Sequence, residues 1–528
     1  MGVCQCIFTW FYPGLTPAYA CGEDDAPVAA HAARSSPSRP MDSRSPLVQP
    51  AVSRSLLPLI LATLLGACSS AGPDYLPREA QAPAAWKAPT AGTRPAEGDE
   101  LARWWTQLSD PLLTGLIEEA LQANPDLKAS AAALRAARAS RSVASANRFP
   151  TLSAGAGASR SKAFGADKSL YDAAFDASWE PDVFGASRRA LEAADADLAA
   201  SLADLQAARV SLVAEVALNY VELRAYQARL GIARSNLGSQ SETLQITDWR
   251  ARAGLVGSLD VEQARSNRDT TRAVIPTLET GQAAAEHRLA LLTGRSPGSL
   301  HGRLAVQEGT AAGLPVVPEQ VGLLIPAEAL RQRPDVKAAE RRVAAETARV
   351  GQAEAARYPG FSLSGSIGLQ ALGLSTFTGG GQLARSLAAS VSGPLFDGGR
   401  LRAQVDVREA VREQSVAAYE KAVLLALEDV HNALVALAGG RERQAALASA
   451  AEAARNAALL ASHRYRSGLI DFQTVLSTER SLLSIEDSLA TADAERLTAL
   501  IRLYKALGGG WSPDAAATTS LVTTHERS

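Results

Sequence analysis

The sequence is poor in cysteine, methionine, histidine and aromatic residues. Its 528 residues include four cysteines, two methionines and six histidines, and every cysteine and methionine lies at or before position 68. Beyond that position no disulfide can form, and no thiol is available as a nucleophile or metal ligand. The charges nearly cancel, with 53 Lys and Arg against 55 Asp and Glu. A general electrostatic attraction to nucleic acid is therefore excluded as well.

The remaining residues form no catalytic or metal-binding motif. A zinc site needs several ligands at close spacing, whereas the histidines stand apart at His31, His287, His301, His431, His463 and His525. A Gly-x-Ser-x-Gly elbow is absent, and the glycine run 379–381 lacks the Lys and the helix of a phosphate loop. The sequence therefore predicts a protein that is not an enzyme, with no metal site and no cofactor.

An export signal is predicted ahead of Cys68. Residues 1–40 have no periodicity and are interpreted as a misassigned gene start, with a disordered extension as the alternative. From Met41 the chain reads as a new start, with basic residues followed by a short apolar run over 56–65. That run is about half of the roughly 20 residues that a membrane-spanning helix needs. Residues 41–67 are therefore interpreted as a signal peptide.

The end of this signal resembles a bacterial lipobox, in which the cysteine is acylated and becomes the mature N-terminus. Leu65 and Ala67 stand at −3 and −1 before Cys68. A plain secretory signal with an incidental cysteine is the alternative, but Cys68 is the last cysteine and has no disulfide partner in the exported part. By analogy with bacterial lipoproteins, Ser69 is not the Asp that retains them at the inner membrane. We expect a lipid such as palmitate on Cys68 and anchoring at the outer membrane.

The body of the chain is an internal repeat. Asn124-Pro125 recurs as Arg333-Pro334, and Phe149-Pro150 recurs as Tyr358-Pro359, both at an offset of 209 residues. We therefore divide the exported chain into an extended tether and equatorial segment, a first repeat, a linker, a second repeat and a disordered tail, at 68–108, 109–300, 301–325, 326–511 and 512–528.

Within each repeat, the residues after the aromatic-Pro pair alternate between apolar and small polar types. This alternation predicts strands at about 151–160, 171–180, 361–370 and 386–394. One apolar face and one small polar face are typical of strands in a transmembrane β-barrel; two soluble hairpins lying on the helices are the alternative. Four strands cannot close a barrel, and lipid does not tolerate open sheet edges. Several chains must therefore share one barrel.

Long helices are predicted for the rest of each repeat. No proline interrupts 186–250, the second copy runs over about 400–465, and partner helices follow at about 259–292 and 472–507. A helix of this length reaches roughly 100 Å. Residues at heptad spacing predict a coiled-coil seam in the first helix, including Leu191, Leu198, Leu202, Leu205, Leu212, Val216, Leu223 and Leu230.

Two glycine-containing turns reverse these helices. Gly254-Leu255 recurs as Gly468-Leu469 at an offset of 214 residues. Glycine suits helix termination and tight reversal. We expect these turns to be the tips of two helical hairpins, at the ends farthest from the strands.

At this point the residues resemble a known family, the TolC/NodT-type outer membrane factors, which are efflux transporter outer membrane lipoproteins. The resemblance covers essentially 68–511 and is carried by Cys68-Ser69, Trp104-Trp105, Asp110-Pro111-Leu112, Asn124-Pro125-Asp126-Leu127 and the closing run from Tyr504 to Trp511. It implies a mainly α fold with a membrane β-barrel. In such a homotrimer, four strands per chain complete a twelve-stranded barrel, and long coiled-coil helices continue it as a periplasmic α-barrel.

The resemblance also implies a function: the exit duct of a tripartite efflux system that passes small molecules such as drugs. Its partners would be a periplasmic adaptor protein and an inner-membrane transporter of the resistance-nodulation-division type. In the family the adaptor meets the tips, which correspond here to Gly254, Leu255, Val256, Gly257, Ser258, Gly468, Leu469 and Ile470. The carboxylate that best matches the family's closed gate is Asp471, and three copies on one axis would favour cations.

Two other functions remain open from the sequence. The exit duct of a type I protein secretion system uses the same architecture, although the lipobox and Trp104-Trp105 favour drug efflux. A coiled-coil envelope scaffold that forms no channel is the alternative from a different class. The sequence does not indicate the transported substrate, because selectivity lies mainly in the transporter.

Overall fold

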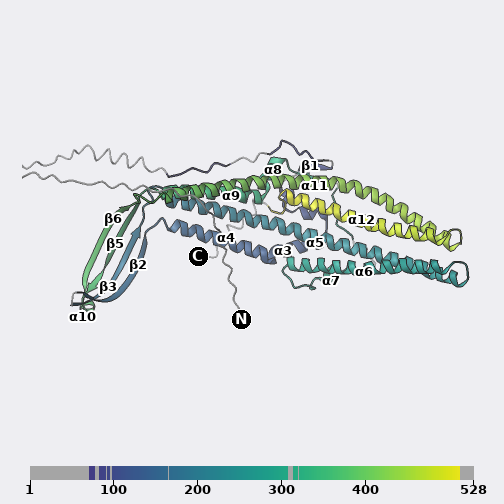
Figure 1. Ribbon diagram of the computed structural model, residues 1–528, viewed down its shortest axis with the longest axis horizontal. Helices are drawn as coiled ribbons and strands as arrows, with labels where there is room; N and C mark the ends of the chain where they lie inside the picture. Colours follow the sequence, from purple (N-terminus) through teal and green to yellow (C-terminus); the bar gives the residue numbers. More distant parts are fainter. Residues whose placement is uncertain are drawn as a thin grey trace, which may run out of the picture. The chain divides into compact units, whose positions relative to one another are not determined.

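The computed structural model places a four-stranded sheet and two long helical hairpins in one unit, which lies within Leu61–Ser528. The described residues are 70–77, 82–90, 92–95, 98–163, 166–306, 313–318 and 320–511. The predicted signal peptide, Cys68 and the predicted tail 512–528 lie outside them. Within this unit a four-stranded sheet lies at one end of the long helices, and two helix–turn–helix tips lie at the other end (Figure 1).

Four long helices form two antiparallel hairpins. α5 (Ala186–Arg252) and α11 (Arg400–Arg466) each have 67 residues and follow the strands. α6 (Ser258–Leu292) and α12 (Phe472–Ala506) each have 35 residues and return from the tips. α5 packs on α6, and α11 packs on α12. The two hairpins therefore have the same dimensions, as expected for a repeat.

Shorter helices complete the helical part. α4 (Pro125–Ala146) and α9 (Pro334–Ala355) precede the strands, and each begins with the proline of the repeated motif at its first turn. α4 packs on α5, and α9 packs on both α5 and α11. The other short helices are α2 (Gly98–Ala102), the 3-10 helix η1 (Trp104–Leu108), α3 (Pro111–Ala123), α7 (His301–Leu304), α8 (Pro326–Gln332) and α10 (Leu374–Thr378).

The main sheet has the order β2-β3-β5-β6, and all of its neighbours are antiparallel. Its strands are β2 (Thr151–Ala163), β3 (Ala166–Trp179), β5 (Gly360–Ala371) and β6 (Gln382–Ser392). The four predicted strands are thus present, and the first hairpin is longer than predicted. The ladder continues where charged residues hide the alternation, as in the pair Lys162–Asp167. A small parallel pair joins β1 (Thr93–Pro95) to β4 (Val321–Leu323).

The largest apolar core lies where α3, α5, α6 and α12 meet the segment from α2 to η1. Trp104 is 1% exposed and stacks on Tyr504, with 5.1 Å between the ring centroids. The segment that follows α12 folds back onto this core, since the Gly510 amide donates to the Leu101 carbonyl at 2.9 Å. The closing motif from Tyr504 to Trp511 therefore locks the N-terminal aromatic pair in place.

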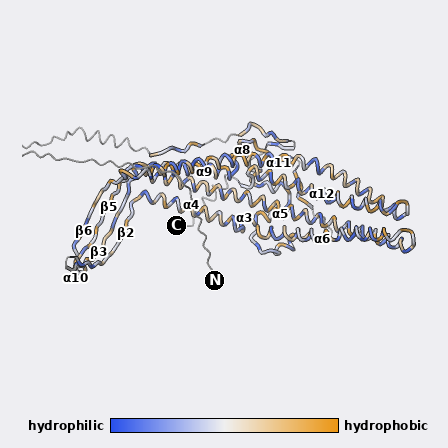
Figure 2. The backbone as a smooth tube through the Cα atoms, in the orientation of Figure 1, coloured by the Kyte–Doolittle hydropathy of each residue, from blue (hydrophilic) through white to orange (hydrophobic). Residues whose placement is uncertain are grey.

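The predicted leucine seam is wrong for the first half of α5. Leu202 is 38% exposed, and Leu191, Leu198 and Leu205 are only half-buried. The buried side chains there are mainly small, and they include Ala193, Ala200 and Ala203. α5 contacts α4, α6, α9 and α12, so small side chains face helices on several sides in place of one leucine seam. Along this helix, apolar and polar residues alternate at short intervals (Figure 2).

The seam prediction holds farther along the same helix. Beyond the region of small side chains, the predicted heptad positions are buried: Leu212, Val216, Leu223 and Leu230. Val423, Val430 and Leu437 occupy the corresponding buried line of α11. The heptad positions in these parts of α5 and α11 are therefore buried, although Val423 packs against α8 and α9 and not against α12.

Candidate functional site

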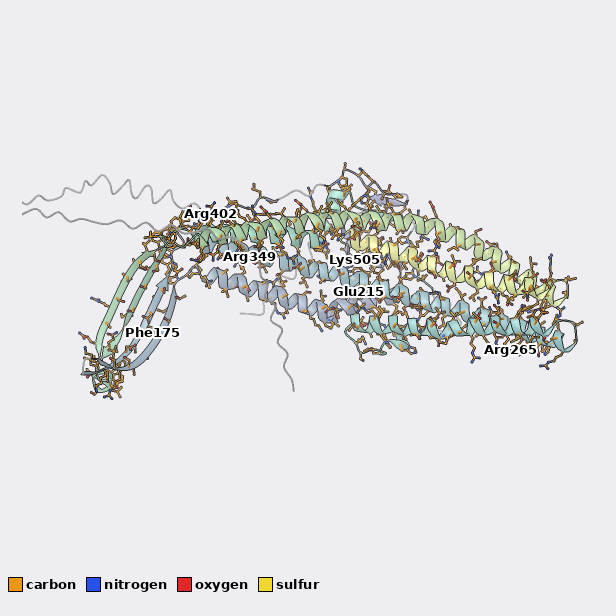
Figure 3. The ribbon with its side chains drawn as sticks, viewed as in Figure 1. Phe175, Glu215, Arg265, Arg349, Arg402 and Lys505 are labelled. Atoms are coloured by element: carbon orange, nitrogen blue, oxygen red, sulfur yellow. The ribbon has the colours of Figure 1, made fainter. Side chains whose placement is uncertain are left out.

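The two faces of the main sheet differ sharply in chemistry. The strand registers put aromatic and aliphatic residues on one face and serine, glycine and aspartate on the other. We call the first the apolar sheet face; Phe175, labelled in Figure 3, lies on it. It carries Leu152, Tyr171, Phe175, Trp179, Phe361, Leu363, Ile367, Leu369, Leu383, Leu387 and Val391.

The other face, which we call the polar sheet face, is lined by small hydroxyl groups. Ser362 and Ser390 hydrogen-bond across β5 and β6 at 2.6 Å, and Ser366 and Ser386 do so at 2.7 Å. The same face carries the carboxylates Asp172 and Asp176 of β3. A side chain at Gly157 would meet the Asp172 carboxylate at 2.9 Å, so the glycine leaves room for it. A wall of this chemistry suits contact with water.

Within the described residues, the sheet is open at both edges. β2 and β6 each pair on one side only within the described residues. Below them, at the junction with the helices, Phe184 stacks on Tyr358 with 4.7 Å between centroids. The repeat gives Phe149 and Phe396 as the equivalent aromatics, yet they are 67% and 93% exposed. Phe149, the equivalent of Tyr358, and Phe396, the equivalent of Phe184, are thus exposed, whereas Tyr358 and Phe184 stack on each other inside the chain.

The segment that follows Cys68 is fixed at the same junction. The Ala71 amide donates to the Phe184 carbonyl at 3.0 Å. Arg189 of α5 is 3% exposed, and its guanidinium donates to the carbonyls of Ala71 and Gly72, each at 3.1 Å. It also pairs with Asp74 at 2.8 Å. We call residues 70–75 the strap; a buried cation holds it to the start of α5.

The two tips have the same backbone geometry. Gly254 and Gly468 lie at φ of 70° and 74°, a region that favours glycine. The amides of Leu255 and Leu469 donate back to the carbonyls of Arg250 and Arg464, at 2.9 and 2.8 Å. This is the Schellman type of helix termination. It leaves the two leucines 67% and 73% exposed, as apolar points at the ends of the hairpins.

The predicted tip residues are therefore at the surface and close to the turn. Val256 and Ile470 are half-buried, and Ile470 packs against a small apolar cluster around Phe472. Gly257 is the N-cap of α6, which begins at Ser258. These residues offer mostly backbone and aliphatic surface, without a charge of their own.

Asp471 caps α12. Its carboxylate accepts from the Thr474 hydroxyl at 2.6 Å and from the Thr474 amide at 3.0 Å. These hydrogen bonds, the hydroxyl first, lower the pKa of Asp471 below its ordinary value. The side chain is exposed and ionised at neutral pH. It can therefore serve as a fixed negative charge at the tip.

The chain is similar to known proteins over both repeats. The family description "Outer membrane efflux protein" matches residues 116–295 and 325–509. The chain belongs to this family. The family description matches each repeat separately, on either side of the linker.

The chain covers nearly the whole length of its named relatives. The chain is 35% identical over 480 residues to the pyoverdine export outer membrane protein OpmQ of Pseudomonas putida, covering 87% of this chain and 98% of that protein. It is 32% identical over 467 residues to nodulation protein T of Rhizobium leguminosarum bv. trifolii, covering 86% and 97%. The solved structure of the outer-membrane channel OprN matches with a TM-score of 0.77 at 38% identity, covering 84% and 99%. This outer membrane efflux protein thus shares the fold of outer membrane channels.

One polar site, close to the tips, was not predicted from the sequence. Glu479 of α12 is 9% exposed and accepts from the Thr243 hydroxyl of α5 at 2.6 Å. Its second oxygen accepts from the Asn267 amide of α6 at 3.4 Å. The site therefore joins three helices from both hairpins.

A pattern in α5 could have revealed this polar seam. Its residues are spaced as a buried helix face requires, and all are at most 8% exposed: Asn236, Gln240, Thr243 and Thr247. The prediction for this helix was based on its leucines and not on these polar residues. Near the tips, the two hairpins of this efflux protein are held together by polar groups as well as by the cluster around Phe472.

The stability of this contact should depend on pH through Glu479. Burial raises the pKa of the Glu479 carboxyl, and the Thr243 hydrogen bond offsets only part of this shift. A raised folded-state pKa stabilises the fold below the ordinary pKa of glutamate, and this contribution is lost as pH rises through the raised value. We expect the midpoint temperature of thermal unfolding to rise when the pH is lowered from neutral.

Glu479→Gln should remove this pH dependence, because glutamine keeps an acceptor for Thr243 and cannot ionise. Glu495→Gln is the matched control on α12, since Glu495 is exposed and pairs with Arg443 at the surface. Melting curves of the three proteins at pH 5 and pH 8 measure the effect. An unchanged pH response in Glu479→Gln would show that another group causes it.

Proposed function

We propose that this chain is the outer membrane exit duct of a tripartite efflux system, through which small molecules pass to the exterior. It is a conduit and not an enzyme. The observation that carries the proposal is the sheet with one apolar and one small polar face, placed at the end of helices roughly 100 Å long. The apolar face meets lipid, the polar face meets water, and the helices extend into the periplasm.

The duct is a homotrimer with a twelve-stranded barrel. Open sheet edges are not tolerated in lipid, so β6 of one copy pairs with β2 of the next. The exposed Phe396 and Phe149 then meet as Phe184 and Tyr358 do inside one chain. α11 presents further exposed apolar side chains for the neighbouring copy, among them Val407, Leu424, Leu425 and Val435.

The partners are a periplasmic adaptor at the tips and an inner-membrane transporter of the resistance-nodulation-division type. Exposed Leu255 and Leu469 at matching turns supply repeated apolar contacts for adaptor hairpins. Gly254, Val256, Gly257, Ser258, Gly468 and Ile470 complete this surface. Alanine or charged substitutions at the two leucines would test it by co-purification of the adaptor.

Conductance in planar bilayers tests the proposed function directly. Purified full-length protein should sediment as a trimer and should produce discrete current steps. Deletion of the gene should increase the sensitivity of cells to some antibiotics, dyes or solvents. A protein that never conducts, and that sediments as something other than a trimer, would favour the envelope scaffold.

Lipidation of Cys68 is the second part of the proposal. The described chain begins at Ser70, and the strap fixes it beside the strand–helix junction, where acyl chains can enter the membrane next to the barrel. Cys68→Ser is expected to abolish labelling by radioactive palmitate. Ser69→Ala is the matched control and should be labelled as the wild type is. Persistent labelling of Cys68→Ser would contradict lipidation at this residue.

Asp471 is proposed as a gate residue. Three ionised copies near one axis repel each other unless a cation or water lies between them. Asp471→Ala is expected to raise the basal conductance. Asp471→Asn separates the two roles of the residue, because asparagine keeps the helix cap and removes the charge. It should lower cation selectivity without loosening the turn, whereas unchanged current and selectivity in both variants would remove Asp471 from the gate.

A further inference from the structure

The helix α4 lacks a neighbour that its repeat equivalent α9 has. α4 packs on α5, whereas α9 packs on both α5 and α11. In the same way, α5 packs on both α4 and α9, whereas α11 packs on α9. Within the described residues, one face of α4 and one face of α11 are therefore left without the partner that the repeat provides between α9 and α5.

Exposed residues on these two faces correspond to buried residues of the other repeat. α4 and α9 are related by an offset of 209 residues, and α5 and α11 by an offset of 214. Ala136 of α4 is exposed, whereas its equivalent in α9, Ala345, is 0% exposed. Gln414 of α11 is exposed, whereas its equivalent in α5, Ala200, is 4% exposed. Since α9 and α5 cover each other, the exposed faces of α4 and α11 are suited to do the same between two copies.

Two ion pairs fix how α9 lies along α5. Arg342 of α9 pairs with Asp204 of α5 at 2.6 Å. Seven residues farther along α9, Arg349 pairs with Asp197 at 2.5 Å. Because the partner in α5 moves back by seven residues at the same time, the two helices are antiparallel and keep one register over two turns.

The same register can be transferred to α4 and α11. The offsets relate the two ion pairs to two pairs of uncharged residues: Ala133 with Ala418, and Ser140 with Val411. If α9 of a second copy packed on α11, its two arginines would face no carboxylate at these levels. α4 carries no charge at the equivalent positions. The exposed face of α11 therefore fits α4 of a second copy and rejects α9.

Charged groups of opposite sign come level in this register. Arg138 of α4 is level with Glu413 of α11, and Arg135 lies about one turn away. All three side chains are exposed, and in the part of the chain that the structure describes no ion pair includes them. Arg141 of the same helix is already paired with Asp195 of α5. Two cations of α4 and one carboxylate of α11 are thus available for a contact between copies.

We propose that α4 of one copy packs on α11 of the next, with Glu413 paired to Arg138 and Arg135, three times per trimer. This seam rests on the proposed function, since it requires the closed trimer. It continues the pairing of β6 with β2, because α4 leads into β2 and α11 follows β6. An exposed ion pair changes an equilibrium about fivefold at most. Its main effect here is to set the partner and the register of the seam.

Cross-linking tests the register. No cysteine follows Cys68, so a pair of introduced cysteines can be linked selectively. Ala136→Cys combined with Gln414→Cys should give linked dimers and trimers with a short bifunctional maleimide, because the two positions are one residue from level. Ala136→Cys combined with Arg412→Cys is the matched control and should not link. Arg412 is two residues from Gln414, about 200° around the helix, and lies on the other side of α11.

Charge reversal tests the ion pair. Glu413→Arg and Arg138→Glu should each increase dissociation of the purified full-length trimer about fivefold per seam. The ratio of trimer to single copies is measured by native mass spectrometry over a dilution series. The double variant, in which the two charges are exchanged, should restore most of the trimer. A general folding defect in the single variants would not be restored in this way.

The two tests separate the seam from the proposed function. Linking through Arg412→Cys in place of Gln414→Cys would overturn the register. A double charge variant that dissociates as readily as the single ones would overturn the ion pair. If neither cysteine pair links in samples that sediment as conducting trimers, the seam is wrong and the proposed function stands. Wild-type protein that neither conducts nor forms a trimer would instead contradict the proposed function.

Discussion

Tyr465→Ala is expected to open the tips of the proposed duct. Tyr465 of α11 is 2% exposed, and its hydroxyl lies 3.1 Å from the Thr247 hydroxyl of α5. The Arg250 guanidinium lies 4.5 Å from the centre of its ring and donates to its carbonyl at 2.6 Å. This one ring therefore joins the second hairpin to the first, just above the turns.

Removal of a buried aromatic side chain costs about 3–5 kcal/mol. If the contact belongs to the closed arrangement, a loss of about 3 kcal/mol shifts the closed–open equilibrium roughly 100-fold in each copy. We expect a higher basal conductance in bilayers and increased entry of a large antibiotic such as vancomycin into cells. Both are measured against the wild type at equal protein levels.

Two control variants separate this effect from general destabilisation. Tyr465→Phe keeps the ring and loses only the hydroxyl contact, so it should change the conductance less. Tyr419→Ala removes a ring that is 6% exposed on the same helix, in a cluster with α8 and α9 far from the tips. Equal conductance changes in Tyr419→Ala and Tyr465→Ala would show that the tip contact does not hold the duct closed.

Trp104→Ala is expected to have the largest effect on stability. Trp104 stacks on Tyr504 and meets Trp105 edge-on at 6.1 Å. A side chain on Gly509 would approach the Trp104 ring to 3.0 Å, so the closing glycines are packed directly against it. Loss of this side chain should lower the free energy of unfolding by about 3–5 kcal/mol.

The same substitution at Trp249 is the matched control. Trp249 of α5 is 57% exposed, and exposed substitutions change stability by about 0.5 kcal/mol or less. Denaturant unfolding followed by circular dichroism should show a lower midpoint for Trp104→Ala and little change for Trp249→Ala. A similar midpoint in both variants would show that the aromatic stack contributes little to the equatorial core.

The sequence predicted the elements of this fold well because its periods are simple. Proline marks the starts of α4 and α9, glycine marks both tips, and alternation marks the strands. It predicted the first half of α5 poorly because a heptad pattern assumes a single partner helix. That part of α5 has partners on several sides, so its small side chains, and not Leu202, are buried.

The site was only partly readable for a similar reason. Turn chemistry is local, so Gly254 and Gly468 identify the tips. The contacts across hairpins are not local: Glu479 meets Thr243 from 236 positions away in the chain, and no spacing rule connects them. Asp471 illustrates the converse, since its role as a helix cap follows from Thr474 three residues later, while its distance from the neighbouring copies depends on assembly.

The open edges of the sheet have a consequence for biogenesis. The helical hairpins satisfy their backbone groups internally, whereas β2 and β6 of an isolated copy would leave unpaired amides and carbonyls in lipid. In the proposed trimer, insertion and association are then a single mass-action step. At low expression the number of inserted pores should rise more steeply than in proportion to the chains made. If the chain assembles as proposed, a cell that makes half as much of it would therefore lose more than half of these pores.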